Sequence, residues 1–138
     1  MPKPVSDLAE LLATMTPELN EQRVAFLTFA NGLNPFAPAD TIGTFREREG
    51  LTVAADLNAA EASGHPILFK AAWITLTVHS DFEAVGLTAA FAKALTEAGI
   101  SANVIAGAFH DHIFVPLDKA EAAMAALRAL QSGAGPIP

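Results

Sequence analysis

Hydrophobic and polar residues alternate most regularly in the second half of the chain. Ile74, Leu76 and Val78 alternate with polar neighbours, which is typical of a strand with one buried face. A polar stretch containing glycine, 79–86, follows this strand. Apolar residues then recur at helical spacing, as Leu87, Phe91 and Leu95, until Gly99 ends the pattern. The pattern predicts a strand, a turn and a helix between residues 74 and 98.

The rest of the second half predicts a hairpin and a last helix. We expect a strand over 103–109, a turn at His110-Asp111-His112 and a strand over 113–115. Asp118 and Glu121 have the spacing of a capping box at the start of a helix. The apolar face of that helix consists of Ala120, Met124, Leu127 and Leu130.

The first half is less regular. Ser6 can cap a helix that ends near Pro17, and the stretch 31–40 is a loop by its Gly, Pro and Asn content. Asp56 can cap a short helix that stops at Gly64. Strands are predicted over 24–30, 41–46 and 51–55.

A weak internal repeat relates the two halves. Residues 49–62 align with residues 111–124, each as a turn, a strand, an Asp and a helix. We therefore predict an abbreviated first half over 1–66 and a second half over 67–138. The order in the second half is most of a ferredoxin-like βαββαβ unit, so the expected class is α+β, with helices packed on one face of an antiparallel sheet. Its missing final strand is expected to come from the first half.

Composition narrows the classes of function. The chain has 138 residues, 51% of them hydrophobic, which suits a packed core. Its net charge of −7 argues against nucleic-acid binding. The absence of cysteine excludes disulfides and thiol chemistry. No apolar run is long enough to cross a bilayer and no signal peptide is evident, so we expect a cytoplasmic protein.

The best candidate site is the turn before the helix at Leu87. Val85, Gly86 and Leu87 are placed at the helix start, where backbone N–H groups lack partners within the helix and can hold a carboxylate. Asp81 can cap the helix or hold a ligand ammonium group, and Asn103 offers an amide at the start of the next strand. The alternative is an ordinary strand-to-helix turn without a ligand.

Two other clusters carry ionisable groups. His110, Asp111 and His112 are metal-ligand types, but a polar hairpin turn explains them equally and we favour it. Arg46 or Arg48 could face an anion, although alternating charges more often cover a solvated hairpin. No phosphate loop, HExxH motif or nucleophile motif is present, and we expect no cofactor.

Residues 79–107, HSDFEAVGLTAAFAKALTEAGISANVIAG, resemble the ligand-binding signature of ACT domains. With TFREREGLTV and AGAFHDHIFVP, nearly the whole chain resembles small stand-alone bacterial proteins built from two ACT-like halves. The resemblance implies a non-catalytic regulatory protein that binds an amino acid or similar metabolite, commonly at an interface between paired domains. It places the ligand at Asp81, Val85, Gly86, Leu87 and Asn103, and it implies a homodimer.

Three hypotheses therefore remain: a small-molecule-binding regulatory protein, which we favour, a metal-dependent enzyme using His110, Asp111 and His112, and a structural partner protein without a ligand.

Overall fold

The structure is a computed structural model that describes residues 12–77 and 87–133. Its elements in chain order are β1 (Thr16–Leu19), β2 (Val24–Phe29), the 3-10 turn η1 (Pro38–Asp40), β3 (Thr41–Glu47), β4 (Gly50–Asp56), α2 (Leu57–Ser63), β5 (Phe69–Thr77), α3 (Leu87–Glu97), β6 (Asn103–Ala106), β7 (Asp111–Pro116), η2 (Leu117–Lys119) and α4 (Ala120–Gln131).

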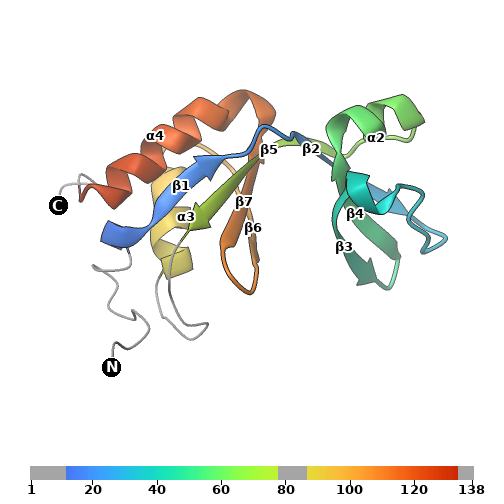
Figure 1. Ribbon diagram of the computed structural model, residues 1–138, viewed down its shortest axis with the longest axis horizontal. Coiled ribbons are helices and arrows are strands. Elements are labelled where there is room, and N and C mark those ends of the chain that lie inside the picture. The colour runs from blue at the N-terminus through green and yellow to red at the C-terminus, as the bar shows by residue number, and fades with distance from the viewer. Residues whose placement is uncertain (1–11, 78–86, 134–138) are drawn as a thin grey trace.

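The described strands form a single seven-stranded sheet. Six of them run in the order β3-β4-β2-β5-β7-β6, and β1 pairs with β5 next to the start of β2. Every pairing is antiparallel. The helices lie on one face, and in Figure 1 the β3–β4 and β6–β7 hairpins extend away from α2 and α4. The expected α+β class, with helices on one face of an antiparallel sheet, is confirmed.

Strand β5 joins the two halves of the sheet. Its first residues pair with β2, from Phe69 to Ala71, and its last residues pair with β1, from Ile74 to Thr77. β5 therefore gives the first half a fourth strand, and β1 gives the second half the final strand of its βαββαβ order. The expectation that the first half supplies this strand is confirmed. The division after residue 66 falls between α2 and β5 and stays a prediction.

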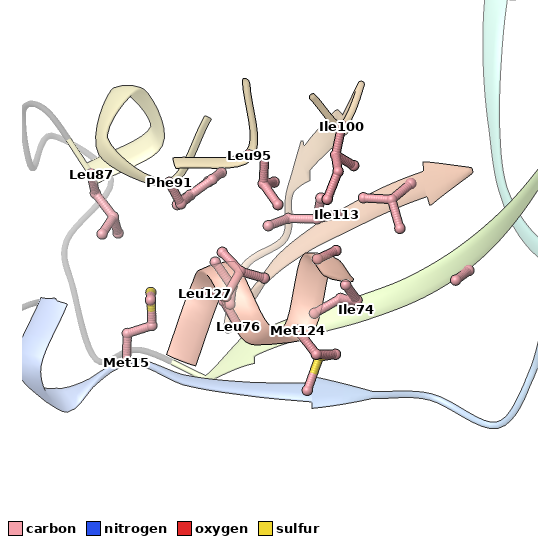
Figure 2. Close-up of a cluster of buried hydrophobic side chains, with 13 residues drawn as sticks. Met15, Ile74, Leu76, Leu87, Phe91, Leu95, Ile100, Ile113, Met124 and Leu127 are labelled. Atoms are coloured by element: carbon pink, nitrogen blue, oxygen red, sulfur yellow. The ribbon is translucent and has the colours of Figure 1, made fainter. Parts of the chain in front are cut away.

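The larger core lies between this sheet and the helices α3 and α4. Figure 2 shows Met15, beside β1, among side chains of α3, α4, β5 and β7. Phe91, Leu95 and Leu127 are fully buried there. A smaller cluster packs α2 on β2 and β4 through Leu57 and Ala60. Because Met15 and β1 belong to the first half, the core of the second half depends on residues from the start of the chain.

Several local predictions are confirmed. The Asp56 carboxylate accepts a hydrogen bond from the Ala59 backbone N–H at 3.0 Å, which caps α2. Gly64 ends α2 with a φ of +75°, a left-handed conformation that glycine adopts without strain. Of the helix predicted after Ser6, residues 12–14 are helical, and residues 1–11 lie outside the described part.

Two local predictions are wrong. The turn lies at residues 107–110, where the Gly107 N–H bonds the His110 carbonyl at 2.9 Å, and Asp111 and His112 begin β7. The polar residues Asp111 and His112 belong to the strand because they pair with Leu76 and Thr75 of β5.

Asp118 does not cap α4, because it lies in η2. The N-cap position is Lys119, which makes no side-chain cap bond.

Candidate functional site

The helix start predicted to bind a ligand is described only from Leu87 onward. Asp81, Val85 and Gly86 lie outside the described residues, and their part in a site stays a proposal. Leu87 is the first residue of α3, as predicted, and its side chain is buried in the larger core. Leu87 can therefore offer a ligand its backbone N–H, not its side chain.

The structure does not bring Leu87 and Asn103 together within one copy of the chain. Asn103 lies opposite Phe114 on β7, and Phe114 lies opposite Trp73 on β5. The pairing of β5 with β7 continues from Trp73 as far as Leu76, towards α3. Three residues of strand separate these levels, which is about 10 Å. β5 and β6 both pair antiparallel with β7, so β6 runs parallel to β5. It therefore begins near the C-terminal end of α3, whereas Leu87 is at the N-terminal end. Asn103 is exposed and, as the Cα partner of Phe114, lies on the face of the sheet without helices.

His110, Asp111 and His112 do not converge on one point. Asp111 pairs with Leu76, whose side chain belongs to the core beneath the helices, whereas His112 pairs with Thr75 on the other face. His110 lies in the exposed turn. Within residues 12–77 and 87–133, no group of three or more His, Cys, Asp or Glu residues is placed to hold a metal ion.

His112 is held by a hydrogen-bond network on the helix-free face. The Trp73 indole N–H donates to His112 Nδ1 at 3.1 Å, and Thr75 Oγ1 is 3.2 Å from the same nitrogen. Asn20 Nδ2 donates to Thr75 Oγ1 at 3.0 Å. An indole nitrogen can only donate, so Nδ1 is the acceptor and the neutral ring carries its proton on Nε2. The network fixes both the orientation and the tautomer of His112.

A pocket of about 400 Å³ lies on the same face. Ala54 and Phe114, which form a separate buried cluster with Val24 and Ala71, make its floor together with Phe26, which is partly buried against that cluster. Phe45 from β3 and Ile105 from β6 form opposite walls, and Figure 1 shows those strands on either side of β2 and β5. The other lining residues are Ile42, Gly43, Thr44, Thr52, Trp73, Val104 and His112.

The sequence pattern described above does not predict this pocket, although one residue of its lining, Trp73, indicates it. Trp73 lies between the buried Ala72 and Ile74, so its side chain is on the other face of β5, where the alternation predicts polar residues. A large apolar residue there indicates that this face of the strand is also covered. That signal was obscured because the partners of Trp73 come from distant strands: Phe114 stacks on it with ring centres 6.1 Å apart. Arg46 lies outside this site, since it pairs with Leu51, on the opposite face from Phe45.

Comparisons with known proteins agree with this topology. An ACT domain family profile matches residues 3–72, just over half of the chain, and a second one matches residues 69–129.

The chain belongs to the ACT domain family.

Its match to two ACT profiles, one on each half, bears out the resemblance seen in the sequence. A solved Vibrio cholerae protein of unknown function, described as a possible transport protein, is 45% identical. It has a TM-score of 0.82, with 94% of this chain and 99% of that chain covered. No curated protein gave a match.

More distant structures share the fold alone. The regulatory subunit of aspartate kinase from Thermus flavus is 11% identical with a TM-score of 0.56, covering 84% of this chain and 95% of that chain. Aspartate kinase from Clostridium acetobutylicum is 7% identical with a TM-score of 0.58, and the match covers 84% of this chain and 34% of the enzyme. ACT domains are regulatory, non-catalytic modules that typically bind small molecules. In the described part of this ACT protein, no helix is both long and apolar enough to span a bilayer.

The His112 network predicts a pH dependence of stability. Burial lowers the pKa of His112 below its usual 6.5, the charge of His110 lowers it further, and Asp111 opposes them. Between the folded and unfolded pKa values the unfolded chain binds more protons, so the free energy of unfolding rises with pH. This stability is complete above about pH 6.5 and is lost as the pH falls towards the lowered folded pKa.

We expect His112→Gln to flatten this dependence, measured by urea unfolding between about pH 5.5 and 7.5. Burial raises the pKa of Asp111 from 3.8, and the charge of His112 lowers it. The effect of burial acts in the opposite direction at more acidic pH and is retained in the variant. Equal slopes for the two proteins would show that His112 titrates normally in the folded chain.

Proposed function

We propose that this ACT protein is a cytoplasmic, non-catalytic regulator that binds an amino acid or another small carboxylate at the turn from Asp81 to Leu87. Membership of the ACT family is the observation that carries the proposal. The start of α3 adds a physical reason, because unpaired backbone N–H groups and the helix dipole favour a carboxylate there. Asp81 can accept a hydrogen bond from the ligand ammonium group.

Asn103 enters this site from a second copy of the chain. β6 is an edge strand of the described sheet, and an edge strand can pair with another chain. In an antiparallel pair of β6 strands, the start of one strand lies beside the end of the other. The end of β6 is also the end at which β5 leaves the sheet and α3 begins. A homodimer of this kind brings the backbone at Asn103 of one copy towards the helix-start end of the other, while the Asn103 side chain lies on the face of the sheet without helices.

A thermal-shift panel of amino acids and small carboxylates tests the proposal. A true ligand at a hundred times its dissociation constant stabilises the fold by about 2.7 kcal/mol, which raises the melting temperature by several degrees. Gly86→Val should abolish the shift, because the added side chain blocks close approach of a ligand to the backbone. Thr88→Val, an exposed change in the first turn of α3, should preserve it.

Asn103→Ala adds a test of the dimer site. A weaker ligand shift, with an unchanged dimer in light scattering, would show that the Asn103 side chain reaches the ligand. An unchanged shift would show that only the β6 backbone lies near the ligand. No shift with any compound in the panel would favour a structural protein without a ligand. A shift that survives Gly86→Val would place the ligand elsewhere.

A further inference from the structure

His112 accepts a hydrogen bond that its charged form cannot accept. The Trp73 indole N–H donates to His112 Nδ1 at 3.1 Å, and an indole nitrogen can only donate. The neutral ring already carries a proton on Nε2, so a second proton binds to Nδ1. The two N–H groups then face each other. Because the edge of an aromatic ring is positive, the charge of the imidazolium adds repulsion, and the bond to Trp73 is lost.

Thr75 responds to the same proton differently. Its hydroxyl can donate to the free Nδ1 of the neutral ring, or accept from the Nδ1–H of the charged ring. The oxygen has two lone pairs, so it can also keep the hydrogen bond from Asn20 Nδ2, which is 3.0 Å long. Protonation of His112 therefore removes the bond to Trp73 and leaves the link through Thr75 to Asn20 in place.

The ring of His112 has neighbours at both of its nitrogens. Trp73 and Thr75 lie at Nδ1, and Gly107 lies at Nε2, where an added Cβ would be 3.2 Å away. Turning the ring over would bring a C–H group towards Trp73 in place of Nδ1. Neither orientation of the charged ring offers an acceptor to the indole.

Among the described residues, carboxylates outside the β6–β7 hairpin are remote from His112. Its cross-strand neighbours on β5 and β6 are Thr75 and Ile105, which carry no charge. Glu18 of β1 lies opposite Thr75, two strands and about 10 Å from His112, and Glu47 lies on β3 at the far edge of the sheet. Both are exposed, so water and salt weaken their effect on the ring.

The groups of the hairpin itself set the pH at which His112 binds a proton. Burial lowers the pKa of His112 below 6.5, the charge of His110 lowers it further, and Asp111 opposes them. The ring is therefore mostly neutral near pH 7, with the bond to Trp73 intact. It becomes charged as the pH falls through the lowered pKa.

Trp73 connects His112 to the aromatic side chains of the helix-free face. Its ring stacks on Phe114 with centres 6.1 Å apart, and Phe26 lies edge-on to Phe114 at 5.3 Å. All three line the pocket. Without the bond to His112, the indole is held by packing alone, so a proton on one strand changes the freedom of a side chain in this cluster.

We propose that His112 is a proton-sensitive switch for Trp73: the neutral ring fixes the indole on the helix-free face, and a proton on Nδ1 releases it. The switch is independent of the ligand site at the helix start. It differs from a loss of global stability, because the folded chain changes at one side chain.

The chain has one tryptophan, so a ¹⁵N–¹H spectrum holds a single indole signal that follows the switch. Between about pH 7.5 and 4.5, we expect this signal to move upfield as the hydrogen bond is lost. Its midpoint should lie below pH 6.5 and coincide with that of the His112 ring nitrogens. Above the midpoint, the shifts of these nitrogens should report a proton on Nε2 alone.

His112→Asn and His110→Asn form a matched pair of variants. The side-chain oxygen of Asn takes a position close to that of Nδ1 and accepts at every pH, so His112→Asn should hold the Trp73 signal at its hydrogen-bonded position throughout. His110 is exposed in the turn, and its charge lowers the pKa of His112. The same change there should keep the titration of Trp73 and raise its midpoint.

Four results would overturn the proposal. They are an indole signal that stays in place while the His112 ring becomes charged, different midpoints for the two side chains, the wild-type titration in His112→Asn, and loss of the dispersed amide signals at the same midpoint. The last result would show unfolding of the whole chain. If His112→Asn does not fold, the ring-nitrogen shifts of the wild type and the midpoint in His110→Asn decide.

Discussion

Residues 66–138 expressed alone are expected to remain without a cooperative fold. The fragment keeps β5, α3, β6, β7 and α4 but loses β1, which pairs with β5 from Ile74 to Thr77. It also loses Met15, which is fully buried against the helices (Figure 2). Removing a buried Met side chain alone costs about 2–5 kcal/mol, and the bare edge of β5 adds to this. The sum is comparable to the stability of a small domain.

Circular dichroism with urea unfolding measures this result, and a permuted chain provides the control. Residues 66–133 followed by a short linker and residues 12–23 place β1 after α4, where a βαββαβ unit has its last strand. The control is expected to unfold cooperatively, since α4 packs beside β1 in the intact chain. A cooperative transition in the fragment without β1 would show that the second half is an independent domain.

Gly50→Ala is expected to destabilise the chain by more than about 2 kcal/mol. Gly50 has a φ of +151°, which side chains rarely adopt, and a Cβ there would lie 2.5 Å from the Phe29 carbonyl oxygen. The Phe29 carbonyl is a backbone group that no rotamer change can move, so relief requires β4 to move away from β2. The free energy of unfolding from urea titration gives the loss.

Gly43→Ala is the matched control, because a Cβ at Gly43 has no neighbour within 4 Å. It lies in β3, the strand paired with β4. We expect its free energy of unfolding to stay within about 1 kcal/mol of the wild type. If the two variants lost equal stability, the approach of Phe29 to Gly50 would not be the cause.

Much of the fold could be predicted from local signals. The stripe of Leu87, Phe91 and Leu95 places α3 correctly, because helical spacing is visible within one element. β1 was not predicted, since its sequence TPEL is short, half polar and contains a proline. The strand forms because β5 has backbone groups with which β1 can pair. Pairing between residues far apart in the chain leaves no local pattern in the sequence.

The candidate site shows the same limit. A glycine-containing turn before a helix can be recognised within a few residues, and the ACT resemblance followed from it. The distance between Leu87 and Asn103 could not be predicted, because it depends on the register of β5, β7 and β6. The pocket depends likewise on Phe45 and Ile105, which come from opposite edges of the sheet.

The early position of β1 has a consequence during synthesis on the ribosome. β1 ends at Leu19, but the last residue of its partner is Thr77. At about 5–20 residues per second, β1 waits roughly 3–12 s after its own synthesis until the end of β5 has been made. The nascent chain therefore carries an unpaired strand through about two fifths of its translation, and the second half closes only when that early segment returns.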